Sequence, residues 1–405
     1  MIANTVNPTK PIASTSEIPE REKIIKQARR IVIKLGSAIL TRQDGLNLVV
    51  LARICDQIAR LLEEKREFIL VSSGAIAAGM RKLRMERKPR SITEKQAVAA
   101  IGQSSLIQSW EDQFRIYGIK AAQILLTGDD LNNRRRYLNA RNTLNMLLSW
   151  GVVPIINEND TVVVEEIKFG DNDNLSALIA GMINADLLIN LTDIGGFYDR
   201  DPHKDAKACL LPVITKIDAR VKECAGHTGG NVGTGGMTSK IQAAQKCMAM
   251  GIPMIIAGGK IRDILTDIFH GKDLGTIFLP KETHYHGKKQ WLMQLSRPKG
   301  KLYLDAGAMR AVVSGGKSLL PIGISRVAGS FGVGDPVECV SVEGRPIGMG
   351  LVNYRSREID QIKGVQSNQI EEILGYKYAD EVIHRDNFAV LPEMVETGNE
   401  NEERG

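Results

Sequence analysis

The chain has 405 residues, too many for one average domain and comfortable for two. Hydrophobic residues make up 43% and charged residues 25%, as in ordinary soluble globular proteins. The net charge of +6 suits anionic partners such as nucleotides or nucleic acid, and equally a mixed solvated surface. The five cysteines form no CxxC pair, which argues against a disulfide framework or zinc site and indicates a reducing cytoplasm. No apolar run approaches the length of a membrane span.

Composition along the chain predicts five segments. Residues 1–27, rich in Pro, Thr and Ser near the start, are expected to be a disordered extension without signal-peptide or transit-peptide features. An α/β domain is expected over 28–285 and a linker over 286–298. A small β-rich barrel over 299–382 and a C-terminal tail over 383–405, acidic and frayed from about residue 392, complete the chain.

Short apolar runs alternate with amphipathic ones in the first domain. An apolar stripe at helical spacing predicts a helix over 49–65. The runs predict strands at residues 30–36, 68–74, 119–127, 152–160, 186–193 and 252–259. This alternation predicts an open, mostly parallel sheet sandwiched by helices. The β-branched run over 161–170 is expected to form a hairpin that projects from the sheet.

Polar residues follow several of these strands at their carboxyl ends, where open α/β sheets form their ligand crevice. They are Lys34, Ser72–Ser73, Asn157–Asp160 and Thr192–Asp193. Four such clusters on one edge predict a shared site.

Lys34 stands inside the apolar strand of "VIKLGSAIL", directly before a glycine turn. A buried ammonium is costly unless it meets an anion, so Lys34 is a candidate phosphate ligand. The alternative is a lysine whose head reaches into water.

The stretch "KFGDNDNLSA" places Asp171, Asn172, Asp173 and Asn174 before a helix-like run. A polar turn with a helix N-cap would explain these residue types. The functional explanation is a site at which an ionised substrate carboxylate attacks a γ-phosphate without a general base, so that the protein must supply positive charge. Asp173 is then the natural acid to orient two lysines.

Two glycine-containing segments could approach a ligand closely. "VSSGAIAAGM" joins a strand to a helix of small residues, although any strand–turn–helix needs such residues. "GGNVGTGGMTSK" offers backbone N–H donors and Lys240 to a triphosphate, or is a surface loop.

Three other patterns do not indicate a functional site. "AVVSGGKS" near residue 315 resembles a P-loop, but Pro321 and Gly323 follow where a helix is required. The six histidines suggest no metal site, and "NNRRRYLNAR" is typical of a solvated helix face or a subunit contact rather than an anion site.

In order along the chain, "VIKLGSAIL", "SSGAIAAG", "PIINEND", "GDNDNLSA", "LTDIGGFYDRDP" and "GTGGMTSK" resemble the amino-acid kinase family. The C-terminal part is similar to a PUA domain. The pair "NEND" and "GDNDNLSA" resembles the branch that phosphorylates the γ-carboxylate of L-glutamate with ATP and Mg²⁺, the first step of proline synthesis.

The resemblance implies a role for each matching residue. Lys34, Lys240 and Asp173 would be catalytic, with Lys34 also contacting the nucleotide. The implied glutamate-binding residues are Ser73, Gly74, Asn157, Asp160 and Asn172. The implied nucleotide-binding residues are Thr192, Asp193, Thr234, Gly235, Gly236, Met237, Thr238, Ser239 and Lys240.

Family members are often inhibited by proline and form dimers or tetramers, so both are implied here. Kinases of aspartate, acetylglutamate, carbamate and uridylate share the architecture and are the nearest alternatives. Asp160 favours a substrate with a free amine, and the C-terminal barrel argues against all four. A protein that primarily binds RNA through the barrel is the remaining alternative, and weak RNA binding beside catalysis stays open.

Overall fold

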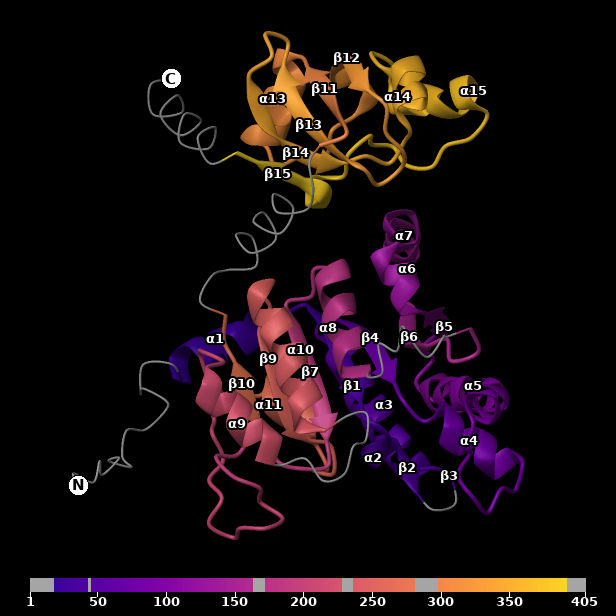
Figure 1. Ribbon diagram of the computed structural model, residues 1–405, viewed down its shortest axis with the longest axis vertical. Coiled ribbons are helices and arrows are strands. Elements are labelled where there is room, and N and C mark those ends of the chain that lie inside the picture. Colours follow the sequence, from indigo (N-terminus) through magenta and orange to yellow (C-terminus); the bar gives the residue numbers. More distant parts are fainter. Residues whose placement is uncertain (1–17, 43–44, 163–171, 228–235, 281–297, 392–405) are drawn as a thin grey trace, which may run out of the picture. The chain divides into compact units, whose positions relative to one another are not determined.

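The computed structural model describes residues 18–42, 45–162, 172–227, 236–280 and 298–391. The chain divides into two compact units, which are described separately (Figure 1): Met1–Asn132 with Asn139–His284, and Asn133–Leu138 with Tyr285–Gly405. The hairpin predicted over 161–170 lies almost wholly outside the described residues.

The first unit contains ten described strands. They are β1 (Arg30–Leu35), β2 (Thr41–Arg42), β3 (Gly45–Leu46), β4 (Glu67–Ser72), β5 (Ala121–Leu126), β6 (Val153–Glu158), β7 (Leu187–Thr192), β8 (Val213–Ile214), β9 (Met254–Gly258) and β10 (Thr276–Phe278). The six predicted strands are confirmed as β1, β4, β5, β6, β7 and β9.

Eight of these strands form one sheet in the order β5-β6-β4-β1-β7-β9-β10-β8. Every pairing is parallel except that of β10 with β9. Strand β7 is buried along its whole length, and β1 is buried from its second residue, as expected where helices cover both faces.

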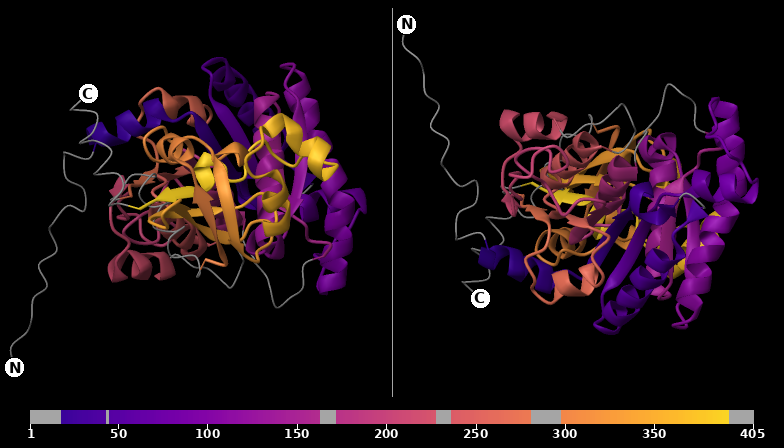
Figure 2. Two further views of the ribbon diagram at one scale, coloured as in Figure 1. Left: turned by 90° about the horizontal axis from the view of Figure 1, so that it is seen from above. Right: turned by 90° about the horizontal axis from the view of Figure 1, so that it is seen from below.

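Described helices of this unit are α1 (Ile18–Gln27), α2 (Ser37–Leu40), α3 (Leu48–Glu63), α4 (Ala75–Lys82), α5 (Ile92–Arg115), α6 (Gly128–Asn132), α7 (Arg134–Ser149), α8 (Asn172–Met182), α9 (Ala219–His227), α10 (Met237–Ala249) and α11 (Ile264–Phe269). Helices α8, α9 and α10 pack together on one face, and α3, α5 and α11 on the other (Figures 1 and 2). The predicted helix over 49–65 is confirmed as α3.

The prediction of disorder up to residue 27 is wrong for residues 18–27, which form α1. Ile25 is buried, and the nearly inaccessible Arg21 donates from Nη2 to the carbonyl of Leu274 at 2.6 Å. A ten-residue helix is marginal in isolation, so its stability comes from docking, a contact that local composition does not encode.

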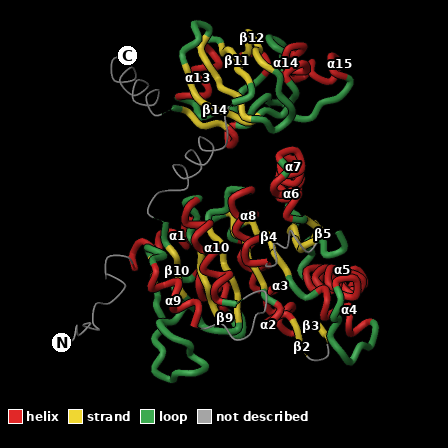
Figure 3. The backbone as a smooth tube through the Cα atoms, viewed as in Figure 1, coloured by secondary structure: helices red, strands yellow, loops and turns green. Residues whose placement is uncertain are grey.

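The second unit is rich in strands, as Figure 3 shows. Its five-stranded sheet has the order β12 (Ile324–Gly329), β11 (Gly300–Leu304), β13 (Pro336–Ser341), β14 (Pro346–Leu351) and β15 (Phe388–Val390). The helical elements are α13 (Ala306–Val313), α14 (Ser356–Ile362), α15 (Ile370–Leu374) and the 3₁₀ turns η2 (Pro321–Gly323), η3 (Ser367–Gln369) and η4 (Arg385–Asn387).

Residues 306–313 of this strand-rich unit form helix α13, which the Asp305 side chain caps by accepting from the Ala308 N–H at 2.7 Å. The boundary expected at residue 382 is corrected, because β15 pairs with β14 and the sheet extends past it. No helix in the described part of the chain is long and apolar enough to span a membrane.

Candidate active site

The candidate site lies where the strand order reverses around β1. The chain runs from β1 to β4 on one side and later returns to β7 on the other. Lys34 of β1 is level with Asn190 of β7, and Leu35 is level with Ser72 of β4. Ligands of open α/β sheets bind in this kind of crevice, outside the carboxyl ends of the strands.

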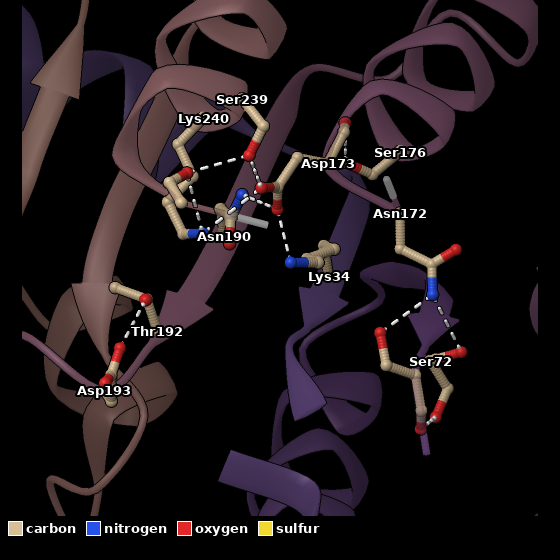
Figure 4. Close-up of polar contacts among 12 residues, drawn as sticks. Lys34, Ser72, Asn172, Asp173, Ser176, Asn190, Thr192, Asp193, Ser239 and Lys240 are labelled. Atoms are coloured by element: carbon tan, nitrogen blue, oxygen red, sulfur yellow. Dashed lines mark hydrogen bonds and ion pairs between the residues drawn. The ribbon is translucent and has the colours of Figure 1, made fainter. Parts of the chain in front are cut away.

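Asp173 is the centre of a polar cluster that joins four elements (Figure 4). Its carboxylate forms ion pairs with Lys34 of β1 and with Lys240 of α10, the latter at 3.2 Å. Ser239 donates to Oδ2 at 2.7 Å, and the Asn190 amide donates to Oδ1 at 2.7 Å. Both carboxylate oxygens are therefore fixed by partners from β1, β7 and α10.

Burial of this cluster strengthens the electrostatic interactions between its charged groups. Asp173 is 0% exposed, Lys34 4% and Lys240 5%. Burial by itself would raise the pKa of Asp173, but the ammonium groups of Lys34 and then Lys240 outweigh it and hold that pKa well below its usual range. The Asp173 carboxylate therefore holds two ammonium groups, those of Lys34 and Lys240, at the crevice.

Helix α10 begins at the end of the predicted glycine-rich loop. Ser239 also donates to the carbonyl of Gly236 at 2.8 Å, Met237 is buried, and the Thr238 hydroxyl faces the carbonyl of Ala225 at 3.5 Å. Lys240 reaches the cavity from this turn. Thr234 and Gly235 lie outside the described residues, so their predicted roles stay predictions.

Asn172 points away from Asp173 and toward the end of β4 (Figure 4). Its amide donates to the Ser73 hydroxyl at 2.8 Å and to Oδ1 of Asn157 at 3.1 Å. Gly74 follows with φ +114° and ψ 0° at the start of α4, a conformation that requires glycine. Three of the predicted glutamate-binding residues are thus joined by hydrogen bonds.

A cavity of about 590 Å³ connects these groups. Its wall contains the predicted residues Lys34, Ser73, Gly74, Asn157, Asp160, Asn172, Thr192, Asp193 and Lys240. Thr192 donates to the Asp193 carboxylate at 3.1 Å. Desolvation raises the pKa of Asp160 to about 6, because burial penalises its charged form. A bound cation near Asp160 would favour its charged form and offset this effect of burial.

Sequence reasoning missed Asn190, Lys88 and Lys95. Asn190 is completely buried, and its second amide atom, Oδ1, has no partner among the described residues. The available signal was a polar residue inside an apolar strand. The strand "LLINLT" contains Asn190 in this way, just as "RIVIKL" contains Lys34. Lys88 and Lys95 line the cavity from outside every motif, and nothing local distinguishes them from surface lysines.

Comparison with known sequences agrees with this geometry. The chain belongs to the amino acid kinase family, whose profile matches residues 29–258, and a PUA domain profile matches residues 300–374. At the level of individual proteins it is similar to two relatives named Glutamate 5-kinase. The relative from Syntrophus aciditrophicus (strain SB) is 49% identical over 92% of this chain and 96% of its own length. That from Meiothermus ruber is 50% identical over 90% of this chain and 97% of its own. A solved UMP kinase structure from Bacillus anthracis matches with 14% identity and a TM-score of 0.44, covering 63% of this chain and 97% of its own.

Proposed function

We propose that the protein transfers the γ-phosphate of ATP to the γ-carboxylate of L-glutamate, giving L-glutamyl 5-phosphate and ADP. The observation that carries this proposal is Asp173 held between Lys34 and Lys240 at the edge of the cavity. Relatives that share about half of its residues over most of their length carry the matching name.

The two halves of the cavity suit the two substrates. Thr192, Asp193 and the start of α10 lie on the side assigned to the nucleotide, with Lys34 and Lys240 at the transferring phosphate. Asn172, Ser73 and Asn157 offer hydrogen bonds to the acceptor carboxylate, and Asp160 offers its charge to the ammonium group. The Asn172–Ser73 hydrogen bond of 2.8 Å fixes one donor of the acceptor side before substrate arrives.

Transfer needs no general base in this arrangement. A γ-carboxylate oxygen attacks the γ-phosphorus, the bond from that phosphorus to the β–γ bridging oxygen breaks, and ADP leaves with the bond's electron pair. Lys34 and Lys240 neutralise charge on the transferring group, and Asp173 holds both ammonium groups in position. The two ammonium groups lower the repulsion between the carboxylate and the nucleotide.

Mg²⁺ fits this site as an ion carried by the nucleotide. No group of three His, Cys, Asp or Glu side chains gathers within the described ranges, whereas Mg²⁺ in kinases is held largely by phosphate oxygens and water. When bound, the ion neutralises phosphate charge.

The reaction is expected to be the first step of proline synthesis, in the cytoplasm. Proline is the expected feedback inhibitor, and the chain is expected to assemble as a dimer or tetramer.

The PUA match is the observation that favours weak RNA binding as a second activity. Loss of RNA retention with rising salt would be its signature.

An acyl-phosphate trap tests the proposal. Protein, ATP, Mg²⁺ and hydroxylamine are incubated with glutamate, aspartate, acetylglutamate or carbamate, and ADP release is followed in parallel, with uridylate as a further acceptor. A glutamate-dependent hydroxamate that proline suppresses is the expected result. A hydroxamate with another acid only would overturn the substrate and keep the chemistry. ADP release with uridylate alone would overturn the carboxylate acceptor.

A further inference from the structure

Two lysines in the cavity wall have no role in the chemistry described so far. Lys88 lies in the loop between α4 and α5, and Lys95 lies in the first turn of α5. Both line the same cavity as Asn172 and Asp160. Neither ammonium group has a hydrogen-bond or ion-pair partner in the part of the chain that the structure describes, unlike Lys34 and Lys240.

The loop that carries Lys88 is held in place by its neighbours. The Glu94 carboxylate accepts from the Arg90 N–H at 2.7 Å and from the Arg87 guanidinium at 3.0 Å. The Arg90 backbone bond and then the Arg87 side chain lower the pKa of Glu94 to about 2, so Glu94 stays ionised. Pro89, next to Lys88, is buried and lines the cavity. The position of Lys88 on the wall is therefore supported by fixed contacts.

The position of Lys95, in the first turn of α5, is electrostatically unfavourable for the helix itself. The N-terminal turn of a helix carries partial positive charge, so a like charge there is unfavourable. The Ser91 hydroxyl already caps this turn by accepting from the Glu94 N–H at 3.1 Å. An anion bound in the cavity would offset this repulsion. Helix capping does not explain a lysine at position 95, because Ser91 already caps the helix.

Both lysines belong to the acceptor side of the cavity. Helices α4 and α5 lie together, apart from α10 and β9 (Figure 1). They pack so closely that a Cβ on Gly102 would lie 1.7 Å from the carbonyl oxygen of Ala75. Lys95 is therefore carried by the same rigid pair of helices that presents Ser73 and Gly74 at its entrance.

We infer that Lys88 and Lys95 bind the α-carboxylate of the acceptor amino acid and so help to select it. This inference rests on the proposed function. Glutamate brings three charged groups: the γ-carboxylate goes to Asn172, Ser73 and Asn157, and the ammonium group goes to Asp160. The α-carboxylate then needs a cation, and Lys88 and Lys95 are the described wall lysines that no internal carboxylate already occupies.

The test uses two acceptor analogues that each lack one charged group. Glutarate keeps both carboxylates and lacks the ammonium group, and 4-aminobutyrate keeps the ammonium group and lacks the α-carboxylate. Inhibition constants against glutamate are measured by ADP release for the wild type, the Lys88→Gln/Lys95→Gln double variant and Asp160→Asn. Lys82→Gln is the matched control, because Lys82 is an exposed lysine at the end of α4 outside the cavity wall.

In the double variant we expect at least a tenfold rise in the KM for glutamate and in the inhibition constant of glutarate. The kcat, the KM for ATP and the inhibition constant of 4-aminobutyrate should stay within twofold. Asp160→Asn should show the reverse pattern for the analogues, and Lys82→Gln should match the wild type. Equal effects on both analogues, no effect on glutarate, or a rise confined to the KM for ATP would overturn the inference.

The two proposals fail separately in this design. A wild-type protein that forms no glutamyl hydroxamate would contradict the proposed function before any variant is compared. A wild type that phosphorylates glutamate, together with a double variant that keeps the wild-type ratio of the two inhibition constants, would contradict only the role of the lysines.

Discussion

Asp173, which is fully buried, and Asp160, which is half-buried, are two aspartates of the same crevice whose pKa values shift in opposite directions. Asp173 is neutralised within the protein by Lys34 and Lys240, and its pKa is pushed down. Asp160 has no lysine or arginine partner in the described part of the chain, and burial raises its pKa to about 6. The comparison separates a carboxylate that builds the site from one that is left for a ligand.

Removing the carboxylate of Asp173 should have the largest effect. Asp173→Asn removes the buried carboxylate that both ammonium groups face, so we expect the free energy of unfolding to fall by about 3–5 kcal/mol. We also expect turnover to fall by roughly a thousandfold, because the lysines lose their orientation. Denaturant unfolding and the hydroxamate assay measure the two effects. Asp129→Asn, an exposed acid in the first turn of α6, is the control. Turnover within tenfold of wild type would show that Asp173 does not organise the site.

Lys240→Ala should reduce turnover by about a hundredfold or more, with a much smaller change in the KM for ATP. The reason is that charge on the transferring phosphate is greatest in the transition state. Steady-state kinetics with varied ATP separate the two parameters, and Lys246→Ala on the exposed side of α10 is the matched control. Unchanged turnover would remove Lys240 from the catalytic residues.

Asp160→Asn should chiefly raise the KM for glutamate, by roughly 10- to 100-fold, through loss of a charged partner for the ammonium group. In the wild type this KM should also rise as the pH falls below about 6, because protonation removes the charge. The variant should lack this pH dependence. A defect seen only in the KM for ATP would contradict the assignment of Asp160 to the acceptor.

The smallest effect expected is on stability at this same position. The folded-state pKa of Asp160 is raised, so its ionisation disfavours the folded state and stability is lost as pH rises through about 6. Asp160→Asn should therefore raise the melting temperature at pH 8 by about 2–4 °C, and the gain should shrink at pH 5. Calorimetry at both pH values checks the sign. A gain that is equal at both pH values would mean that desolvation of the charge is not its cause.

Local sequence signals predicted those site residues that lie at the ends of strands or beside glycine-containing turns. Lys34 was recognisable as a lysine inside an apolar strand, and Asp173 as an acid at the start of a helix. Helix α1 was missed because docking, rather than periodicity, defines it. Asn190 was missed because its importance depends on lying level with Lys34 in the sheet.

The sequence by itself determined the parallel sheet, its helices and the polar edge, because side-chain alternation, glycine and β-branched residues act over a few neighbouring positions. The tertiary structure alone decided which groups meet there. Asp173 became the neutralised carboxylate and Asp160 the free one, while Lys88 and Lys95 entered the cavity from the α4–α5 pair. Those outcomes depend on strand order, register and burial, which bring together residues more than sixty positions apart and change the energy of each charge.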